Sequence, residues 1–190
     1  MLDLRLKTPF TMIMAGPSSS GKTTLLVKLL LEKKDLFIDP PESIRLYYSI
    51  WQDAYDNLKS RRIILDFVEG VPSQEDLESF QKSSKNSLVI FDDLAEQLTP
   101  TISNLFIAGS HHFNTSVILI SQNLFQKNPI WRICSLNSTY LVLLKNPRDP
   151  SQIGVLSRQS FPGQKNFLGN VCEFFIIFSP IIDIYKEYSI

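Results

Sequence analysis

Eight consecutive residues have the types and spacing of a phosphate-binding loop, G-x-x-x-x-G-K-T. They are Gly16, Pro17, Ser18, Ser19, Ser20, Gly21, Lys22 and Thr23, with Thr24 directly after them. The two glycines permit backbone angles that let successive N–H groups converge on phosphate oxygens. Lys22 is expected to reach the β- and γ-phosphates, and the Thr23 hydroxyl to ligate Mg²⁺. The loop therefore predicts binding of ATP with Mg²⁺, through residues 16–24.

The segments on either side of the loop support this interpretation. The apolar run 10–15 has the character of a buried strand, and residues 22–33 carry leucines at helical spacing. The positive end of such a helix favours bound phosphate. An ordinary Gly/Ser-rich turn is the alternative, but it would not require Lys22 and Thr23 beside the second glycine.

A pair of acidic residues, Asp92 and Asp93, follows the short apolar run 88–91. At the carboxyl end of a parallel strand, Asp92 can hold Mg²⁺ through the water shell of the ion. Asp93 is then positioned to deprotonate the water that attacks the γ-phosphate. Asp93 is short for this role, so Glu96 is a second candidate for the base. The alternative is a solvated turn that happens to contain two acids.

Gln122 occupies the same kind of position on another strand, because it ends the apolar segment 115–121. Its amide can hydrogen-bond the attacking water or the γ-phosphate. A surface glutamine in a loop is the alternative. Strand ends are where α/β folds build their sites, which favours the functional interpretation.

Strand-like and helix-like segments alternate along the chain. Further strands are expected at 44–50, 63–68, 139–144 and 171–178, a short polar helix at 52–58, and helix starts at Ser73 and Asp149. Near-continuous apolar strands indicate a mostly parallel sheet covered on both faces. The predicted fold is a three-layer α/β P-loop NTPase. Residues 1–165 would form its core, and residues 166–190 a final strand and tail.

The composition excludes a protein that coats nucleic acid with positive charge over its whole surface. Of 190 residues, 19 are Lys or Arg and 19 are Asp or Glu, so the net charge is zero. Cys134 and Cys172 lack metal-ligand spacing and indicate reduced thiols. Charged residues precede the first apolar run, and residues 171–184 are too interrupted for a membrane span. These features predict an intracellular protein without a membrane segment.

Five segments together resemble the FtsK/HerA group of ring ATPases. They are residues 16–23, 88–93, 109–114 (Gly-Ser-His-His-Phe-Asn), 121–123 (Ser-Gln-Asn) and 145–149 (Lys-Asn-Pro-Arg-Asp). Within that group the chain is most similar to the genome-packaging ATPases of poxvirus-like viruses and of Polinton/Maverick virus-like transposons. The resemblance implies a RecA-like core of the ASCE type, assembled as a homo-oligomeric ring that pumps double-stranded DNA into a capsid. It also implies a capsid protein as a possible partner, in the host nucleus or cytoplasm or in the virion.

The resemblance also implies an arginine that reaches the nucleotide of a neighbouring subunit. His111 stands near its usual place, so we assign this role to Arg148 first, with Arg132 or Arg158 as alternatives. DNA phosphates would be contacted by loop residues, and the candidates are Arg61, Arg62, Lys82, Lys85 and Lys127. Two other functions remain open. One is a nucleoside or small-molecule kinase, for which an Arg-rich lid is missing, and the other is a degenerate protein that binds nucleotide without turnover.

Overall fold

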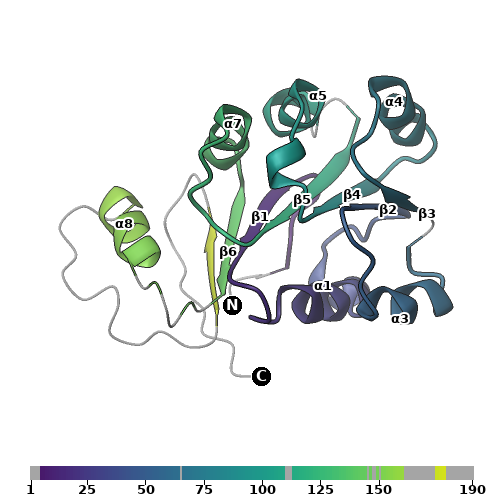
Figure 1. Cartoon of the computed structure of the whole chain (residues 1–190). Coiled ribbons are helices and arrows are strands. Elements are labelled where there is room, and N and C mark those ends of the chain that lie inside the picture. Colours follow the sequence, from purple (N-terminus) through teal and green to yellow (C-terminus); the bar gives the residue numbers. More distant parts are fainter. Residues whose placement is uncertain are drawn as a thin grey trace.

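A mixed sheet forms the centre of the molecule (Figure 1). The computed structural model describes residues 5–64, 66–109, 113–144, 146, 149, 151–160 and 174–178. Its strands are β1 (Thr11–Ala15), β2 (Ser43–Tyr48), β3 (Asp66–Glu69), β4 (Ser87–Asp92), β5 (Thr115–Ser121), β6 (Tyr140–Leu144) and β7 (Phe174–Phe178). They lie in the order β3-β2-β4-β5-β1-β6-β7. All neighbouring pairs are parallel except β6 and β7, which are antiparallel.

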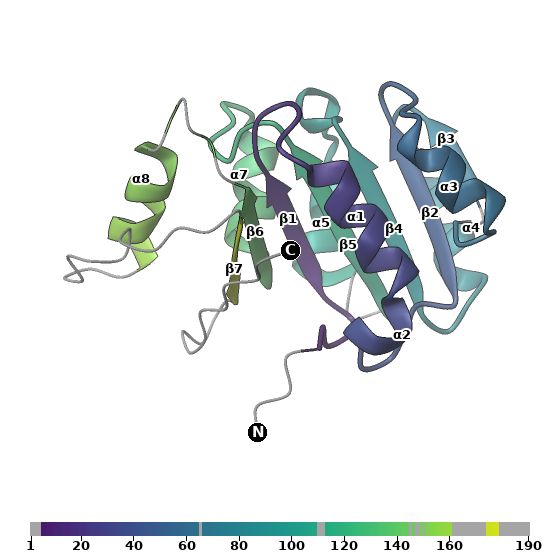
Figure 2. The same cartoon turned by 90° about the horizontal axis from the view of Figure 1, so that it is seen from below.

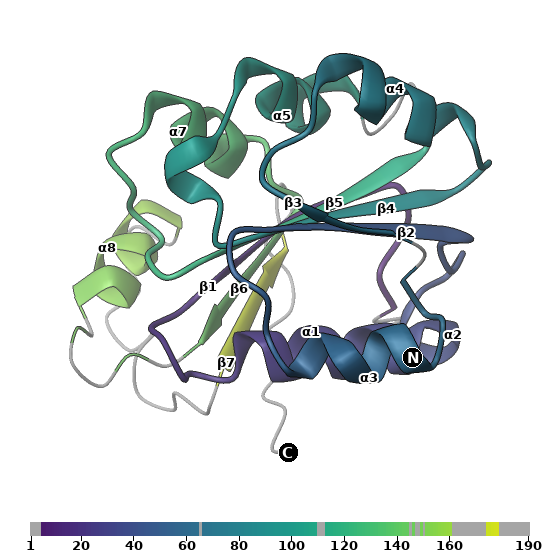
Figure 3. The same ribbon diagram turned by 45° about the vertical axis from the view of Figure 1, so that its right-hand side comes forward.

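Helices cover both faces of this sheet, giving three layers (Figure 3). One face carries α1 (Lys22–Leu31), α2 (Lys33–Leu36) and α3 (Ala54–Ser60). The other carries α4 (Gln74–Lys82), the 3₁₀ turn η1 (Ala95–Gln97), α5 (Pro100–Asn104), the π-helical turn η2 (Leu105–Gly109) and α7 (Pro129–Leu136). Helix α8 (Ser151–Ser160) lies beyond β6 (Figure 2). Two apolar clusters, one on each face, form the core.

The burial of the central strands explains why their sequences are almost wholly apolar. Every residue of β1, β4 and β5 is buried, as expected for parallel strands packed on both faces. Local capping fixes the helices that flank them. The Ser73 side chain accepts a hydrogen bond from the Asp76 N–H at the start of α4, and Asn128 accepts one from Ile130 N–H at the start of α7.

Several expected boundaries are corrected by the structure. The helix expected to reach residue 33 ends at Leu31, because Glu32 has φ −98° and ψ 19°, outside helical geometry. Strand β3 begins at Asp66 rather than residue 63, since the Ile63 N–H bonds the Leu58 carbonyl and closes α3 instead. Helix α3 begins at Ala54, so residue 52 lies in a connection. Helix α7 was not among the elements expected from the sequence.

The strand order places the expected chemical groups at one edge of the sheet. Strand β5 lies between β1, which leads into the phosphate loop, and β4, which ends in Asp92. In the registers of these pairs, Ala15 is opposite Ser121 and Asp92 is opposite Ile120. The carboxyl ends of the three strands therefore meet, with Gln122 following the middle one.

Candidate nucleotide site

Both glycines of the phosphate loop stand where a residue with a side chain would not fit: one lacks space for a Cβ, and the other has a left-handed backbone conformation. A Cβ at Gly16 would lie 2.8 Å from the Cβ of Leu144 and 2.8 Å from the Ser20 Oγ, closer than atoms can approach. Gly21 has φ +94°, in the left-handed region, and immediately precedes α1. The end of β6 thus packs directly against the start of the loop, and α1 begins without a side-chain cap on its first N–H groups.

The polar groups of the loop are suited to hold phosphate. The Ser20 Oγ is buried and has no hydrogen-bond partner among the described residues. The Lys22 ammonium donates to the loop's own carbonyls, at 2.7 Å to Gly16 O and 2.8 Å to Pro17 O. Burial lowers the pKa of Lys22, while the charges of Asp92 and Asp93 oppose that shift. An anion at the loop would satisfy Ser20 and give Lys22 a charged partner.

A chain of hydrogen bonds joins the loop to the first aspartate through Thr23, Gln52 and Asp92. We call it the buried link after Asp92, which is buried, whereas Thr23 and Gln52 are half-buried. The Thr23 Oγ1 donates to Gln52 Oε1 at 2.6 Å, and Gln52 Nε2 donates to Asp92 Oδ2 at 3.0 Å. The Tyr55 hydroxyl also donates to Asp92 Oδ2. The two residues predicted to hold Mg²⁺ are therefore connected through a single amide.

Asp92 is held in a low-polarity environment at the end of β4. It is 3% exposed, and burial raises the pKa of its carboxyl above the ordinary value. The hydrogen bond from Tyr55 acts in the opposite direction, whereas the nearby charge of Asp93 adds to the increase. A bound cation would relieve this electrostatic cost, which is why the donor set fits Mg²⁺. In the described part of the chain no three acidic, histidine or cysteine residues cluster as a metal site, so phosphate oxygens and water would complete the coordination.

The second connection, which we call the exposed link, consists of Ser18, Gln122 and Asp93. Ser18 Oγ donates to Gln122 Oε1 at 3.3 Å, and Gln122 Nε2 donates to both carboxylate oxygens of Asp93 at 3.3 Å. All three residues are exposed. Asp93 has φ 56°, a left-handed conformation that Asp tolerates better than most residues. The extended backbone of β4 therefore ends at Asp92.

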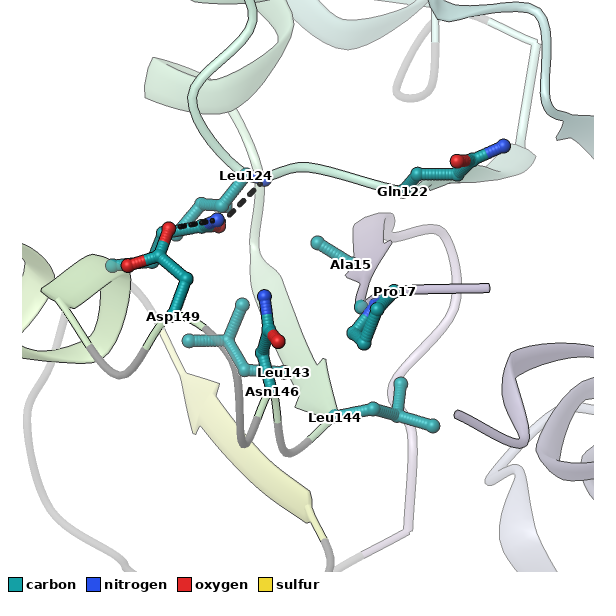
Figure 4. A pocket seen from close by; sticks show the side chains of 10 residues that line it. Ala15, Pro17, Gln122, Leu124, Leu143, Leu144, Asn146 and Asp149 are labelled. Atoms are coloured by element: carbon teal, nitrogen blue, oxygen red, sulfur yellow. Dashed lines mark hydrogen bonds between the residues drawn. The ribbon is translucent and has the colours of Figure 1, made fainter. Parts of the chain in front are cut away.

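A small pocket borders the loop on its β6 side (Figure 4). Its lining includes Pro17, Gln122, Leu144, Asn146 and Gln152. Asp149, also in the lining, caps α8 as predicted: it accepts from Ser151 N–H at 3.1 Å and from Gln152 Nε2 at 3.0 Å. These hydrogen bonds lower the pKa of Asp149. The pocket next to the phosphate loop is therefore lined by both apolar and polar side chains.

With this geometry established, comparison with known proteins decides the family. Residues 3–149 match the family described as Poxvirus A32 protein. The chain belongs to the Poxvirus A32 family. Its curated relatives include DNA packaging protein OPG160 of Variola virus and of Vaccinia virus, each 28% identical over 155 residues and covering 70% of this chain. The chain spans about half the length of these relatives, 54% in both cases.

Solved structures establish the fold of this A32 family member. The DNA-packaging ATPase B204 of Sulfolobus turreted icosahedral virus has a TM-score of 0.62 at 16% identity, covering 96% of this chain and 100% of that one. B204 of Sulfolobus turreted icosahedral virus 2, solved with ATP-gammaS, has a TM-score of 0.59 at 15% identity, covering 95% and 98%. The predicted fold, a P-loop NTPase with a mostly parallel central sheet, is confirmed.

The structure brings most of the predicted site residues of this A32 protein together. The loop, Asp92, Asp93 and Gln122 share one edge of the sheet. Arg148 and His111 lie outside the described residues, as does Cys172. Glu96 is exposed on η1, Arg132 is exposed on α7, and Arg158 lies on α8.

Sequence analysis missed two residues of the site, Gln52 and Tyr55. Gln52 was assigned to a helix, yet it lies in the connection that follows the carboxyl end of β2. The strand-end argument that identified Gln122 applies equally to Gln52 and would have found it. Tyr55 gave no such signal, because its hydroxyl reaches Asp92 from within α3.

The basic residues considered for DNA contact are all exposed, but they lie at different edges. Arg61 and Arg62 lie between α3 and the amino end of β3. Lys82 is the last residue of α4, and Lys85 lies between α4 and the amino end of β4. Lys127 follows the carboxyl end of β5, on the same edge as the nucleotide site. Among the described residues no helix has both the length and the apolar character needed to cross a membrane.

Proposed function

We propose that this chain is the ATP-hydrolysing motor domain that packages double-stranded DNA of a virus or virus-like transposon, acting as a homo-oligomeric ring. Its family and the names of its relatives support a role in DNA packaging. The observation that carries the proposal is the exposed link, since it joins a candidate base, Asp93, to the phosphate loop through Gln122.

Nucleotide binding would begin with a rearrangement of Lys22. Its ammonium would leave the carbonyls of Gly16 and Pro17 for the β- and γ-phosphates, exchanging neutral acceptors for charged ones. The buried hydroxyl of Ser20 and the first N–H groups of α1 would donate to phosphate oxygens. Mg²⁺, held by Thr23 and through water by Asp92, would neutralise charge that develops on the β- and γ-phosphates.

Hydrolysis would require a water aligned with the bond to the β-phosphate oxygen. Gln122 would orient this water, and Asp93 would accept its proton as the water oxygen attacks the γ-phosphorus. The bond between the γ-phosphorus and the bridging oxygen breaks, and its electrons remain on ADP. The three contacts of the exposed link are long, at 3.3 Å, so a bound nucleotide and water would have to bring these groups into closer alignment.

The ring would supply the remaining parts of the motor. An arginine, Arg148 first and Arg132 or Arg158 otherwise, would reach the nucleotide of the neighbouring subunit and stabilise negative charge there. DNA would be held by a few Lys or Arg contacts to phosphates without base readout, with Lys127 on the nucleotide edge and Arg61, Arg62, Lys82 and Lys85 on the opposite one. A capsid protein would be the docking partner, inside the host nucleus or cytoplasm or in the virion.

The decisive experiment measures ATP turnover by the purified oligomer with and without linear double-stranded DNA. We expect DNA to stimulate the rate, and Lys22→Ala to abolish both binding and turnover. Turnover that is indifferent to DNA would contradict the motor assignment. Phosphate transfer to an added nucleoside would instead favour a kinase, and nucleotide binding without any turnover would indicate a degenerate protein.

A further inference from the structure

Gln52 lies between the two side chains expected to hold magnesium, although it belongs to neither of their motifs. Its Oε1 accepts from Thr23 Oγ1 at 2.6 Å, and its Nε2 donates to Asp92 Oδ2 at 3.0 Å. The primary amide of glutamine offers an acceptor and a donor side by side on one flat group that carries no charge. Gln52 can therefore satisfy a hydroxyl and a carboxylate at the same time.

The bond at Thr23 fixes the direction of the hydroxyl proton. A hydroxyl has one proton and two lone pairs, and in Thr23 the proton is directed to Gln52 Oε1. The lone pairs of Thr23 are then directed elsewhere and are available to a cation. Without that acceptor the hydroxyl would be free to rotate and present its proton to the ion, which is electrostatically unfavourable.

The hydrogen bonds at Asp92 involve only one of its two carboxylate oxygens among the described side chains. Both hydrogen bonds that Asp92 accepts from described side chains, from Gln52 and from Tyr55, end at Oδ2. Oδ1 is thereby the oxygen left for the water shell of a cation. Gln52 thus hydrogen-bonds both predicted magnesium ligands. In each ligand an oxygen lone pair, on Thr23 Oγ1 or on Asp92 Oδ1, remains available to the ion or its water shell.

The chain on either side of Gln52 packs into a cluster of aromatic rings. Tyr55 is fully buried, and its ring centroid lies between 5.5 and 6.2 Å from those of Tyr48, Trp51 and Phe67. Trp51, the immediate neighbour of Gln52, belongs to this cluster. The connection between β2 and α3 is therefore anchored on both sides of Gln52, which limits the positions that its amide can take.

From this geometry we infer that Gln52 is a positioning residue for the magnesium–nucleotide site, acting through Thr23 and Asp92. The inference rests on the proposed function, because it concerns the same nucleotide. Residues that orient metal ligands typically change metal affinity by about 10- to 100-fold when they are removed. Among the described residues, the side-chain hydrogen bonds of Gln52 go to Thr23 Oγ1 and Asp92 Oδ2 and not to the backbone of the phosphate loop. We therefore expect its removal to leave nucleotide binding without the metal unchanged.

The test is calorimetric titration of ATPγS in EDTA and at a series of Mg²⁺ concentrations. The variant Gln52→Met keeps the length and approximate volume of the side chain but loses both hydrogen bonds, and Gln52→Ala removes the side chain altogether. Gln74→Ala is the matched control, because Gln74 is exposed on α4 and its side-chain amide donates a hydrogen bond to Glu78, away from the nucleotide site. We expect Gln52→Met to weaken the apparent Mg²⁺ affinity about tenfold, with ATPγS binding in EDTA like that of wild type.

Three results would overturn the inference. Unchanged Mg²⁺ affinity in Gln52→Met would show that the amide does not act on the ligands. Increased affinity would show that it competes with the ion for their space. An equal loss of binding with and without Mg²⁺, together with a lower melting temperature, would show a merely structural role. In each case wild type still binds ATPγS, so the proposed function survives; failure of wild type to bind would instead remove both.

Discussion

The buried link and the exposed link tie the same phosphate loop to the same pair of aspartates, yet they are built differently. The buried link has contacts of 2.6 and 3.0 Å and ends at an aspartate that is 3% exposed. The exposed link has contacts of 3.3 Å throughout, between side chains that all face solvent. The fold thus fixes one connection and leaves the other adjustable.

This difference matches the two tasks that the links would perform. A magnesium ion requires ligands in a nearly fixed geometry, which the short, partly buried hydrogen bonds of the buried link can maintain. An attacking water must enter, be aligned and be replaced in each cycle, which requires access from solvent. Replacing one residue at a time in each link separates these tasks, because changes in the buried link should act on metal-dependent binding and changes in the exposed link on turnover.

The largest effect is expected from Asp93→Asn in the exposed link. Loss of a general base should reduce the rate of ATP hydrolysis by about 10²- to 10⁴-fold. ATPγS binding should be retained, because among the described side chains Asp93 accepts hydrogen bonds from Gln122 and not from Thr23 or Lys22. Steady-state phosphate release and calorimetry measure the two quantities. Normal turnover in this variant would place the base elsewhere, with Glu96 the first residue to replace.

The corresponding change in the buried link, Asp92→Asn, should act on binding first. Removing the charge that faces the ion should weaken magnesium-dependent ATPγS binding by about 10- to 100-fold, with little change in EDTA. Asp92→Asn and Asp93→Asn each replace one carboxylate oxygen with an NH₂ group, so each variant serves as the control for the other. If both variants lost only turnover, the division of roles between the links would be wrong.

A smaller effect is expected from Gln122→Ala. A single hydrogen bond contributes about 0.5–1.5 kcal/mol, so losing the contact that orients the water should slow hydrolysis about 3- to 10-fold. ATPγS affinity, with and without Mg²⁺, should remain that of wild type. Gln126→Ala is a suitable control, since the Gln126 amide donates a hydrogen bond to Ser121 Oγ and none to Asp93 or the phosphate loop among the described residues. Loss of binding in Gln122→Ala would assign it to the nucleotide rather than to the water.

The smallest effect concerns stability in the absence of nucleotide. Burial raises the folded-state pKa of Asp92 above its unfolded value, so its ionised form costs stability at pH above the folded pKa. That cost disappears as the pH falls through the folded pKa toward about 3.9, the unfolded value. Asp92→Asn should therefore melt higher than wild type at neutral pH, by about 2–4 °C for each kcal/mol recovered, and the difference should vanish in acid. A lower melting temperature at neutral pH would mean that its hydrogen bonds outweigh its burial.

Much of the exposed link could be predicted from sequence, because each of its residues belongs to a pattern that is continuous along the chain. Ser18 lies inside the loop spacing, and Asp93 and Gln122 directly follow apolar runs. Parallel strands bring such positions to one edge, so order along the chain sufficed to place them together. The same argument located Thr23 and Asp92.

The centre of the buried link was missed for an equally physical reason. Gln52 follows a strand whose alternating pattern seemed to extend to residue 50, and the strand ends at Tyr48. Because the end of this strand was predicted two residues too late, Gln52 was assigned to the following helix instead of the carboxyl edge of the sheet. Tyr55 depends on helix α3 packing over Asp92, a contact between distant segments that no local pattern encodes.

The central claim is that both links converge on the terminal phosphate of one nucleotide. A crystal structure of the oligomer with Mg²⁺ and ATPγS tests it most directly. We expect the Lys22 ammonium on the β- and γ-phosphates, Thr23 on the ion, Asp92 on its water shell, and a water between Asp93, Gln122 and the γ-phosphorus. A nucleotide bound elsewhere, with Lys22 still on the carbonyls of Gly16 and Pro17, would contradict the account.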